Sequence, residues 1–288
     1  MALTIRLLSY NIFCRPPFIT DAGPTGNDYK DERLREILSR IQMYDVVCFQ
    51  EFFRLGSFRQ SRFIAAAQKL GFLNHARASF AWQHGFVADA GLLILSKLSI
   101  LETSSLTYPR GSFHTADFWV SKGLLYVLLE TPEGGRLNLA TTHLQAWDFP
   151  KVREKQLKAA WSFVSDVLGR NPYPFVFAGD FNVPGAGEGG QVDSQEYLNM
   201  MTILWHPRDM LKEKFGVHPP TEGRIRRDRP SPAHPPSIDY ILFYDPRDAS
   251  HGARPAMEGA SVEPFSVETG PFVQCSDHFA VACAFDCD

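Results

Sequence analysis

Hydrophobic residues occur along this chain mostly in short runs typical of β-strands, with a few longer stretches that have helical spacing. Alternating or continuous apolar runs predict eight strands, at residues 4–12, 45–50, 91–95, 123–129, 136–142, 175–178, 239–243 and 279–285. Apolar side chains three and four positions apart predict three helices, over residues 31–42, 61–70 and 151–168. The pattern therefore combines strands in pairs with interleaved helices.

The order of these elements favours two packed β-sheets with helices outside them, which is an α/β architecture. The turn at residues 132–135 (PEGG) joins two predicted strands into a hairpin, and a hairpin breaks the strict strand–helix alternation of a Rossmann sheet. Residues 184–190 and 216–237 are loop-like, the first rich in glycine and the second in proline. Because apolar strands that need partners lie on both sides of each loop, we expect one domain over residues 1–288.

Composition and charge narrow the class of protein without naming its function. The chain is 44% hydrophobic, and its 29 basic and 32 acidic residues give a formal net charge of −3. These values fit a globular protein. They argue against a nucleic-acid binder that works by bulk positive charge, because such domains usually have a pI above ~9.

The cysteines and the N-terminus bear on location. The five cysteines include no CxxC pair. Cys14, Cys48 and Cys283 adjoin apolar runs, which predicts buried free thiols. Cys275 and Cys287 with Cys283 leave a bridge or a metal site open, although their spacing matches no standard zinc pattern. We find no signal-peptide pattern and no apolar run near the ~18 residues of a membrane span. We therefore expect a soluble cytoplasmic protein, while secretion stays open because a removed signal leaves no trace.

Polar functional groups stand at one end of strand after strand. Six short motifs show this arrangement, namely SYN (9–11), QE (50–51), THL (142–144), GDFN (179–182), SIDY (237–240) and SDH (276–278). Taken singly, each has an ordinary explanation as a turn former or a solvated loop residue. Six in one chain indicate a site, because loops at strand ends converge on one pocket.

The side chains in these motifs suit hydrolysis of a phosphodiester at a magnesium site. Carboxylates with substrate phosphate oxygens are the ligands that Mg²⁺ prefers, and imidazoles carry out acid–base chemistry near neutral pH. The sequence has no HExxH helix, no GxxxxGK[ST] loop and no GxSxG turn. A zinc hydrolase, a P-loop NTPase and an α/β-hydrolase are therefore disfavoured.

The six motifs in this order resemble the endonuclease/exonuclease/phosphatase superfamily, which has a four-layered, DNase-I-like α/β sandwich of two mixed sheets flanked by helices. The resemblance spans the chain from Asn11 to His278 and implies a role for each motif. Glu51 would be the principal Mg²⁺ ligand, with Asn11 close to the metal and Asp277 near it or near a second ion. His278 would be the general base, held in its tautomer by Asp239. Asp180, Asn182 and His143 would act on the water, the phosphate and the leaving oxygen.

Within the superfamily, the stretch from Asp89 to Ala146 is most similar to the neutral sphingomyelinases. It contains AGLLILSK, then Phe113 and Asp117, then SKGLLYVLL and THLQAWD. Lys122 would neutralise phosphate, against the alternative of a solvated lysine. Arg153 and Gln156 fit the same pattern, against the alternative that they face solvent.

An aromatic segment after His143 supports a lipid substrate. Trp147 and Phe149 would bind substrate and dip into the headgroup layer, joined by Phe118 and Trp119. The alternative is that these rings pack in the core. Secreted bacterial members of the group carry a long lipid-inserting hairpin, and this chain has no comparable hydrophobic stretch.

The expected function is therefore Mg²⁺-dependent cleavage of sphingomyelin or a related phospholipid at a membrane surface, by a peripheral and monomeric enzyme. Mn²⁺ or Co²⁺ is expected to substitute for Mg²⁺. The alternative is a nuclease, because Arg224, Arg226, Arg227 and Arg229 precede the SIDY motif and could bind a nucleic-acid backbone. An inositol-polyphosphate phosphatase is disfavoured because its characteristic segment is absent. A catalytically dead scaffold is disfavoured because the metal glutamate and both histidines are present.

Overall fold

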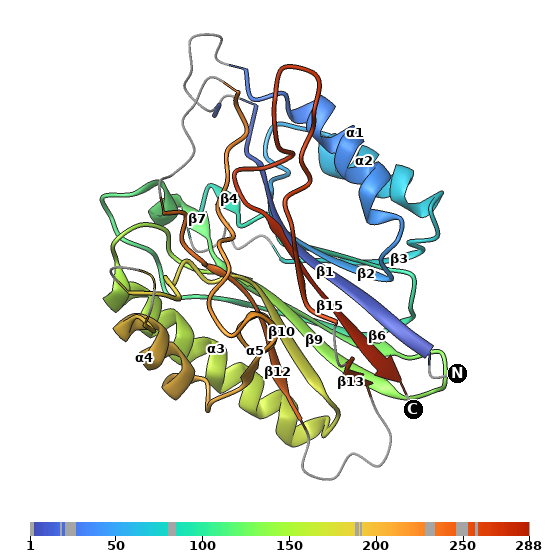
Figure 1. The fold of residues 1–288 in the computed structure, drawn as a ribbon, viewed down its shortest axis with the longest axis vertical. Coiled ribbons are helices and arrows are strands. Elements are labelled where there is room, and N and C mark those ends of the chain that lie inside the picture. The colour runs from blue at the N-terminus through green and yellow to red at the C-terminus, as the bar shows by residue number, and fades with distance from the viewer. Residues whose placement is uncertain are drawn as a thin grey trace.

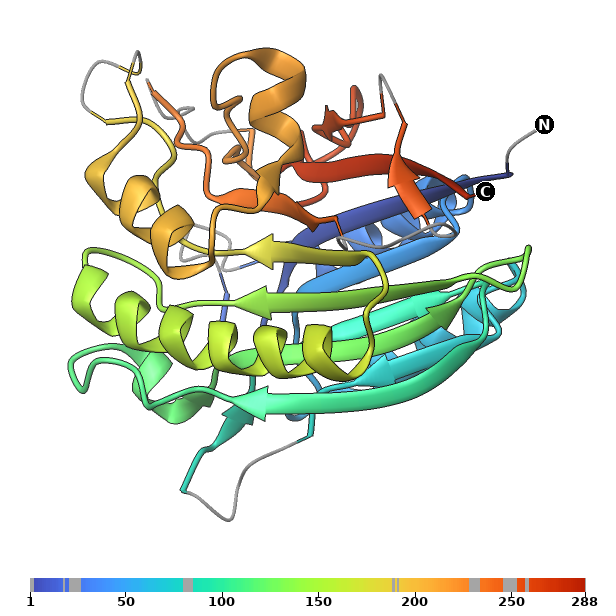
Figure 2. The same ribbon diagram turned by 90° about the horizontal axis from the view of Figure 1, so that it is seen from below.

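Two β-sheets packed face to face form the centre of the molecule, and helices cover their outer faces (Figures 1 and 2). The computed structural model describes residues 3–17, 19–20, 27–79, 85–187, 190, 192–227, 234–245, 253–256 and 259–287. Within these residues the layers run helix, sheet, sheet, helix, which confirms the predicted four-layered α/β sandwich.

The first sheet has seven strands in the described part of the chain. Its main path is β13 (Ala253–Pro255), β15 (Ala280–Cys287), β1 (Leu3–Cys14), β2 (Val46–Phe52), β5 (Leu93–Ser96) and β3 (Asn74–Arg77), and β14 (Ser261–Glu263) pairs with β15. Strands β1 and β2 are parallel and are connected through helix α1 (Lys30–Ile41). Strand β15 returns antiparallel beside β1, so the two ends of the described chain lie side by side (Figure 1).

The second sheet has six strands among the described residues. Their order is β11 (Arg208–Asp209), β12 (Asp239–Tyr244), β10 (Phe175–Asp180), β9 (Arg136–His143), β8 (Gly123–Glu130) and β6 (Ile100–Thr107). Strands β8 and β9 form the predicted hairpin. Strands β9 and β10 are parallel and are connected by helix α3 (Pro150–Arg170), which runs along the outer face of this sheet (Figure 2). A small separate sheet pairs β4 (Ala88–Asp89) with β7 (Val120–Ser121).

The helices fall on opposite sides of the paired sheets (Figure 1). Helices α1 and α2 (Arg59–Gln68) pack their apolar faces on the outer face of the first sheet. Helices α3 and α4 (Gln195–Ile203) do the same on the second sheet. Helix α5 (Met210–Phe215) and the short 3₁₀ helix η2 (Ala116–Trp119) complete the described helices.

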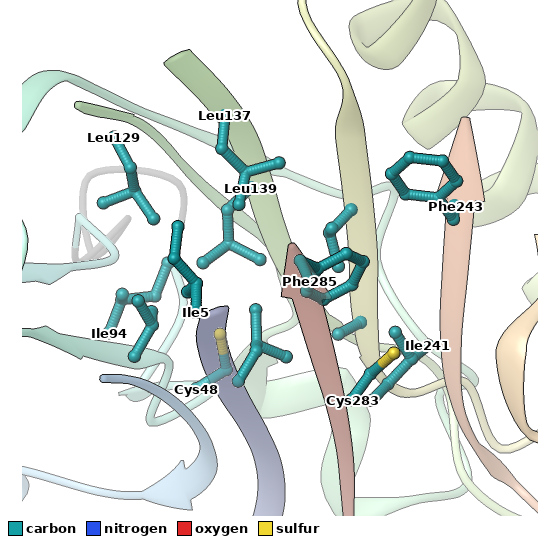
Figure 3. Close-up of a cluster of buried hydrophobic side chains, with 14 of the residues drawn as sticks. Ile5, Cys48, Ile94, Leu129, Leu137, Leu139, Ile241, Phe243, Cys283 and Phe285 are labelled. Carbon is teal, nitrogen blue, oxygen red and sulfur yellow. The ribbon is translucent and has the colours of Figure 1, made fainter. Parts of the chain in front are cut away.

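Between the sheets lies a core of aliphatic and aromatic side chains (Figure 3). Ile5 of β1 and Cys48 of β2 face Leu139 of β9 and Ile241 of β12 across this layer. Because side chains alternate along a strand, the inner face of β1 continues from Ile5 through Leu7 and Ser9 to Asn11. At one end of the strands, polar residues therefore follow the apolar ones on the inner face. The candidate site lies at this end.

All eight predicted strands and all three predicted helices are present, with bounds that shift by one to a few residues. The sequence did not predict β3, β4, β6, β7, β11, β13, β14, α4 and α5. All five cysteines are buried, and Cys275 and Cys283 are free thiols, so the alternative of a bridge among the three cysteines near the C-terminus is wrong.

Candidate active site

The predicted site residues meet at one end of the two sheets because of strand direction and register. The parallel strands β1 and β2 end near Asn11 and Glu51, and the parallel strands β9 and β10 end at His143 and Asp180. The carboxyl ends of parallel strands are where ligand sites form in α/β sheets. Strand β12 runs antiparallel to β10 and begins there, with Asp239 opposite Asp180.

In the second sheet, as in β1, the side chains that face inward along a strand lead from the apolar core to the site. Val176 and Ala178 of β10 are core residues, and Asp180 follows on the same face. On β9 the same alternation leads from Leu139 to His143. Asp180 and His143 are therefore buried between the sheets rather than solvated, as 1% and 3% exposure show.

The side chain of Glu51 does not follow the alternation of inward- and outward-facing positions along β2, because its backbone conformation is unusual. Its φ of 56° lies in the left-handed region, which non-glycine residues rarely adopt. The departure brings its side chain to the pocket described below. Gly91 makes the turn possible, because a Cβ there would lie 2.3 Å from Phe52 N and 2.8 Å from Glu51 C. Glycine is required where two backbones approach this closely.

His278 and Asp239 form a buried pair across the two sheets. His278 Nδ1 lies 2.9 Å from Asp239 Oδ2, which leaves Nε2 directed elsewhere. Burial disfavours the imidazolium, but the carboxylates of Asp239, Asp180 and Asp277 outweigh this effect and hold the pKa of His278 well above its usual value. The pair has the geometry by which a carboxylate fixes the tautomer of a catalytic histidine.

Asp180 lies at the centre of the site. Its Oδ2 accepts a hydrogen bond of 2.9 Å from Asn11 Nδ2, and the same oxygen is 3.3 Å from His143 Nε2 and 3.8 Å from His278 Nε2. Its Oδ1 accepts the backbone N–H of Asn182 at 2.9 Å. Burial raises the pKa of Asp180 to about 6. One carboxylate thus connects both imidazoles.

His143 is paired with Lys122, and we call these two residues the basic pair. Lys122 Nζ is 2.8 Å from His143 Nε2, donates to Leu144 O at 2.7 Å and lies 3.2 Å from Asp117 Oδ2. Burial and the Lys122 ammonium hold the pKa of His143 well below its usual value, so the imidazole is neutral. Lys122 is buried, so the alternative of a solvated lysine is wrong.

Asn11, Glu51 and Asp277 form a set that we call the acidic group, in which the Glu51 carboxylate has few close partners. The Glu51 carboxylate lies 3.4 Å from Asn11 Nδ2 and 3.9 Å from His143 Nε2. Burial, followed by the charge of Asp277, raises the pKa of Glu51 to about 7. Burial also raises the pKa of Asp277. The excess of negative charge is what a hard divalent cation would neutralise.

Two sets of residues could hold a metal ion. Ligand atoms of Asp180, Asp239 and His278 lie within 4.8 Å of one another. However, Asp239 and His278 already satisfy each other through their 2.9 Å hydrogen bond. Among the described residues, the carboxylate of Glu51 has no comparably short contact, and its side chain, which is 16% exposed, opens on the pocket. The oxygen donors of the acidic group therefore fit Mg²⁺ better than the first set does.

A pocket of about 740 Å³ opens over these groups. It is lined by most of the predicted site residues, and also by Arg15, Glu222 and a set of apolar side chains. The sequence did not indicate Glu222, which lies in the proline-rich loop, where nothing distinguishes it from a solvated acid. Burial raises the pKa of Glu222, with His278 opposing this shift and Asp277 adding to it.

The predicted substrate-binding residues have different positions. Trp147 lines the pocket and is 61% exposed, so it does not pack in the core. Phe149 is half-buried at the N-cap of α3 and is not among the residues that line the pocket. Trp119 lines the pocket, whereas Phe118 packs between Phe113 and Trp119.

Arg153 and Gln156 are buried, so the alternative that they face solvent is wrong. The Arg153 guanidinium donates to both carboxylate oxygens of Glu196, at 2.6 and 2.8 Å, and to the backbone carbonyls of Gln145 and Trp147. Gln156 Oε1 accepts the backbone N–H of Gln145 at 2.8 Å. Both residues thus hold the chain that follows His143.

The arginine-rich loop does not form an exposed basic surface in its described part. Arg226 is buried and Arg224 is half-buried, whereas Arg227 alone among the described three is exposed and donates to Glu268 O at 3.0 Å. Arg229 lies outside the described residues. The loop instead packs Thr221–Gly223 against the segment before β15 that carries His278, through hydrogen bonds from Gly223 N to Asp277 O and from Phe279 N to Thr221 O.

This fold and this arrangement of carboxylates and imidazoles define a class of protein. Residues 8–278 match the model of the Endonuclease/Exonuclease/phosphatase family, and the chain belongs to that family. A sphingomyelinase of Dictyostelium discoideum is 26% identical over 331 aligned positions, which cover 85% of this chain and 72% of that protein. An inositol phosphosphingolipids phospholipase C of Schizosaccharomyces pombe is 29% identical over 168 positions, which cover 54% of this chain and 37% of that protein.

Solved structures show the same fold. Sphingomyelinase C from Streptomyces griseocarneus superposes with a TM-score of 0.69 at 22% identity, over 98% of this chain and 99% of that chain. A beta toxin of Staphylococcus aureus with bound magnesium ions gives a TM-score of 0.65 at 19% identity, over 99% of this chain and all of that chain. The family and these relatives indicate a hydrolase of the phosphodiesterase or phosphatase type. Among the described helices, none is both long enough and apolar enough to cross a bilayer.

Proposed function

We propose that this protein is a magnesium-dependent phosphodiesterase that hydrolyses sphingomyelin, or a closely related sphingolipid, to ceramide and a phosphorylated headgroup. The observation that carries the proposal is the position of Asp180 between the His278–Asp239 pair and the basic pair, beside an acidic group suited to a hard cation. The similarity to a sphingomyelinase over most of the chain supports the substrate class.

In this proposal His278 Nε2 accepts a proton from a water molecule whose oxygen attacks phosphorus. The bond between phosphorus and the ceramide oxygen breaks, and the leaving alkoxide takes up a proton from the Lys122 ammonium, which lies 2.8 Å from His143 Nε2. Asp239 and Asp180 stabilise the imidazolium that forms, consistent with the raised pKa of His278. Asn182 supports Asp180 through its backbone N–H and donates from Nδ2 to Leu144 O.

Glu51, Asn11 and Asp277 would hold the metal ion. Bound Mg²⁺ would polarise a phosphate oxygen as a Lewis acid, and Mn²⁺ or Co²⁺ would substitute for it. Lys122 would add positive charge on the phosphate, and Trp147 would contact the lipid at the pocket rim. The buried free thiols of Cys14, Cys48, Cys275 and Cys283 fit a reducing compartment. We therefore retain the cytoplasm, with peripheral membrane contact and a monomeric state, as predictions.

The test is a comparison of substrates under one set of conditions. Purified protein with Mg²⁺ should release phosphocholine from sphingomyelin in mixed micelles, and EDTA should abolish the release. His278→Ala should lower kcat by about 10²-fold or more, in the range of general base catalysis. The exposed His75→Ala serves as the matched control. Cutting of plasmid DNA without release of phosphocholine would favour the nuclease instead, and activity that survives EDTA would refute the metal-dependent mechanism.

A further inference from the structure

One side of the pocket is apolar, although it adjoins the charged residues of the site. Five lining residues make up this surface, which we call the apolar wall, namely Val87, Ala88, Ala116, Trp119 and Val120. They come from the small β4–β7 sheet, from Val87 directly before it and from the adjacent helix η2. None of them entered the phosphodiesterase mechanism above.

The apolar wall is a fixed part of the fold. Ala88 pairs with Val120 and Asp89 with Ser121 in parallel register, and Val87 N donates to Trp119 O at 2.8 Å. Arg54 Nε anchors Asp89 at 2.6 Å. Strand β4 is followed closely by β5 of the first sheet, and β7 by β8 of the second sheet, so the wall connects the two halves of the molecule.

The wall keeps large apolar side chains in contact with water. Val87 is 53% exposed and Trp119 is 50% exposed, and both line the pocket. Apolar surface that is left exposed inside a concave site favours a ligand that covers it with apolar atoms. A nucleoside or an inositol group carries hydroxyls and would leave them unpaired against this surface.

The wall adjoins the basic pair. Val120 is two residues before Lys122, and Asp117 of η2 lies 3.2 Å from Lys122 Nζ, which in turn is 2.8 Å from His143 Nε2. In the proposed function this pair serves the leaving oxygen. An alcohol that departs there would therefore place its carbon chain along the apolar wall.

We propose that the apolar wall binds the hydrocarbon part of the leaving alcohol of a single lipid substrate molecule, and so selects lipids with an apolar leaving group. The inference rests on the proposed function, because it takes Lys122 and His143 as the leaving-group side. Binding of this kind differs from contact between the wall and a bilayer, because the wall would bind a single substrate molecule even when no bilayer is present.

The experiment compares two soluble phosphocholine esters that differ in the leaving alcohol. These are a short-chain sphingomyelin below its critical micelle concentration and p-nitrophenyl phosphocholine. In the double variant Val87→Ser with Trp119→Ser, the ratio of kcat/KM for sphingomyelin over the nitrophenyl ester should fall about tenfold, as expected for weakened apolar contacts in a pocket. Trp205→Ser is the matched control, because Trp205 is exposed and stacks on Trp161 away from the pocket lining.

A direct binding measurement keeps the inference separate from catalysis. Calorimetric titration with a soluble short-chain ceramide should detect binding to the wild-type protein and about tenfold weaker binding to the double variant. Absence of ceramide binding by the wild type would overturn the inference, and so would an equal loss on both esters. A loss confined to vesicles would overturn it in favour of bilayer contact. Ceramide binding without cleavage of either ester would refute the proposed function but retain the wall as a lipid site.

Discussion

The acidic group, centred on Glu51, and the basic pair of Lys122 and His143 lie side by side but compensate their charges in different ways. The Lys122 ammonium is fully engaged by groups of the protein, namely His143 Nε2, Leu144 O and the Asp117 carboxylate. The Glu51 carboxylate has an amide contact of 3.4 Å and a distant imidazole. Burial raises the pKa of Glu51 to about 7, while burial and Lys122 lower that of His143.

This difference shows which part of the site is complete without a ligand. A buried charge without a partner is costly, whereas a buried charge with several hydrogen bonds is tolerated. The basic pair is therefore preorganised by the chain itself. The acidic group reaches its lowest free energy with a cation bound, so the two groups should respond oppositely to mutation and to metal.

The largest effect is expected for Glu51→Gln, which removes the charge at the centre of the acidic group. Activity with Mg²⁺ should fall by about 10³-fold, comparable to the loss of a key electrostatic group in an active site. The metal-free variant should be at least as stable as the wild type, because an uncompensated buried carboxylate is gone. Thermal unfolding should show that Mg²⁺ raises Tm of the wild type but not of the variant.

Glu222→Gln is the matched control, since Glu222 lies in the same pocket and burial also raises its pKa. Its effect should be smaller than that of Glu51→Gln by an order of magnitude or more. An equal loss in both variants would mean that the total negative charge of the pocket matters and that Glu51 has no special part. A Mg²⁺-dependent rise in Tm that persists in Glu51→Gln would move the metal to Asp180 and its neighbours.

A smaller effect is expected for Asp239→Asn, which tests whether His278 depends on its buried partner. The variant keeps the shape of the side chain but no longer fixes the tautomer in which Nε2 accepts a proton, so kcat should fall by about 10²-fold. KM should change little, because Asp239 lies behind the imidazole. Steady-state kinetics on sphingomyelin micelles measure both values.

A histidine–aspartate pair outside the pocket serves as the control for this prediction. His218 Nε2 lies 3.1 Å from Asp193 Oδ1, and neither residue lines the pocket. Asp193→Asn should therefore lower stability, since Asp193 also accepts from Lys212 at 2.6 Å, without lowering kcat of the folded enzyme. If Asp239→Asn lost stability but kept its kcat, the pair with His278 would be structural and not catalytic.

The sequence predicts those features of the fold and the site that leave a local pattern of apolar and polar residues. Apolar runs in the sequence identify the strands of the core. The polar residues at the ends of these runs, such as Asn11, His143 and Asp180, could therefore be predicted as site residues. Strand β6 (Ile100–Thr107) was missed because it is an edge strand whose side chains are mostly exposed and polar, so it lacks alternation. Strands β4 and β7 have two residues each and exist only through their pairing.

The side chains missed in the site come from segments that pack against it from outside the strands. Glu222 lies in a loop whose position depends on hydrogen bonds to residues 277 and 279, which are distant in sequence. Asp117 belonged to the stretch that resembles the sphingomyelinases, but its contact with Lys122 depends on the short helix η2. The sequence also did not indicate the left-handed backbone of Glu51, because this conformation depends on the close approach of Gly91, which is distant in sequence.

The smallest effect is expected for Arg153→Lys, which loosens the support of the basic pair without touching it. Arg153 holds Gln145 O and Trp147 O, and between them the N–H of Ala146 donates to Asp117 Oδ2 at 2.8 Å. Lysine cannot reproduce the planar fork of a guanidinium. We therefore expect kcat/KM on sphingomyelin to fall about tenfold, as slight misplacement of an active-site group does, together with a lower Tm.

Arg208→Lys separates this positioning effect from a general loss of stability. Arg208 makes a similar bidentate ion pair with Glu213, at 2.6 to 3.1 Å, but on the surface and away from the pocket lining. Its variant should retain kcat/KM. Added guanidinium should restore activity to Arg153→Ala, which a purely structural role of Arg153 would not permit. If neither variant of Arg153 lowered kcat/KM, the basic pair would be held by Asp117 and Leu144 alone, and its preorganisation would not extend to helix α3.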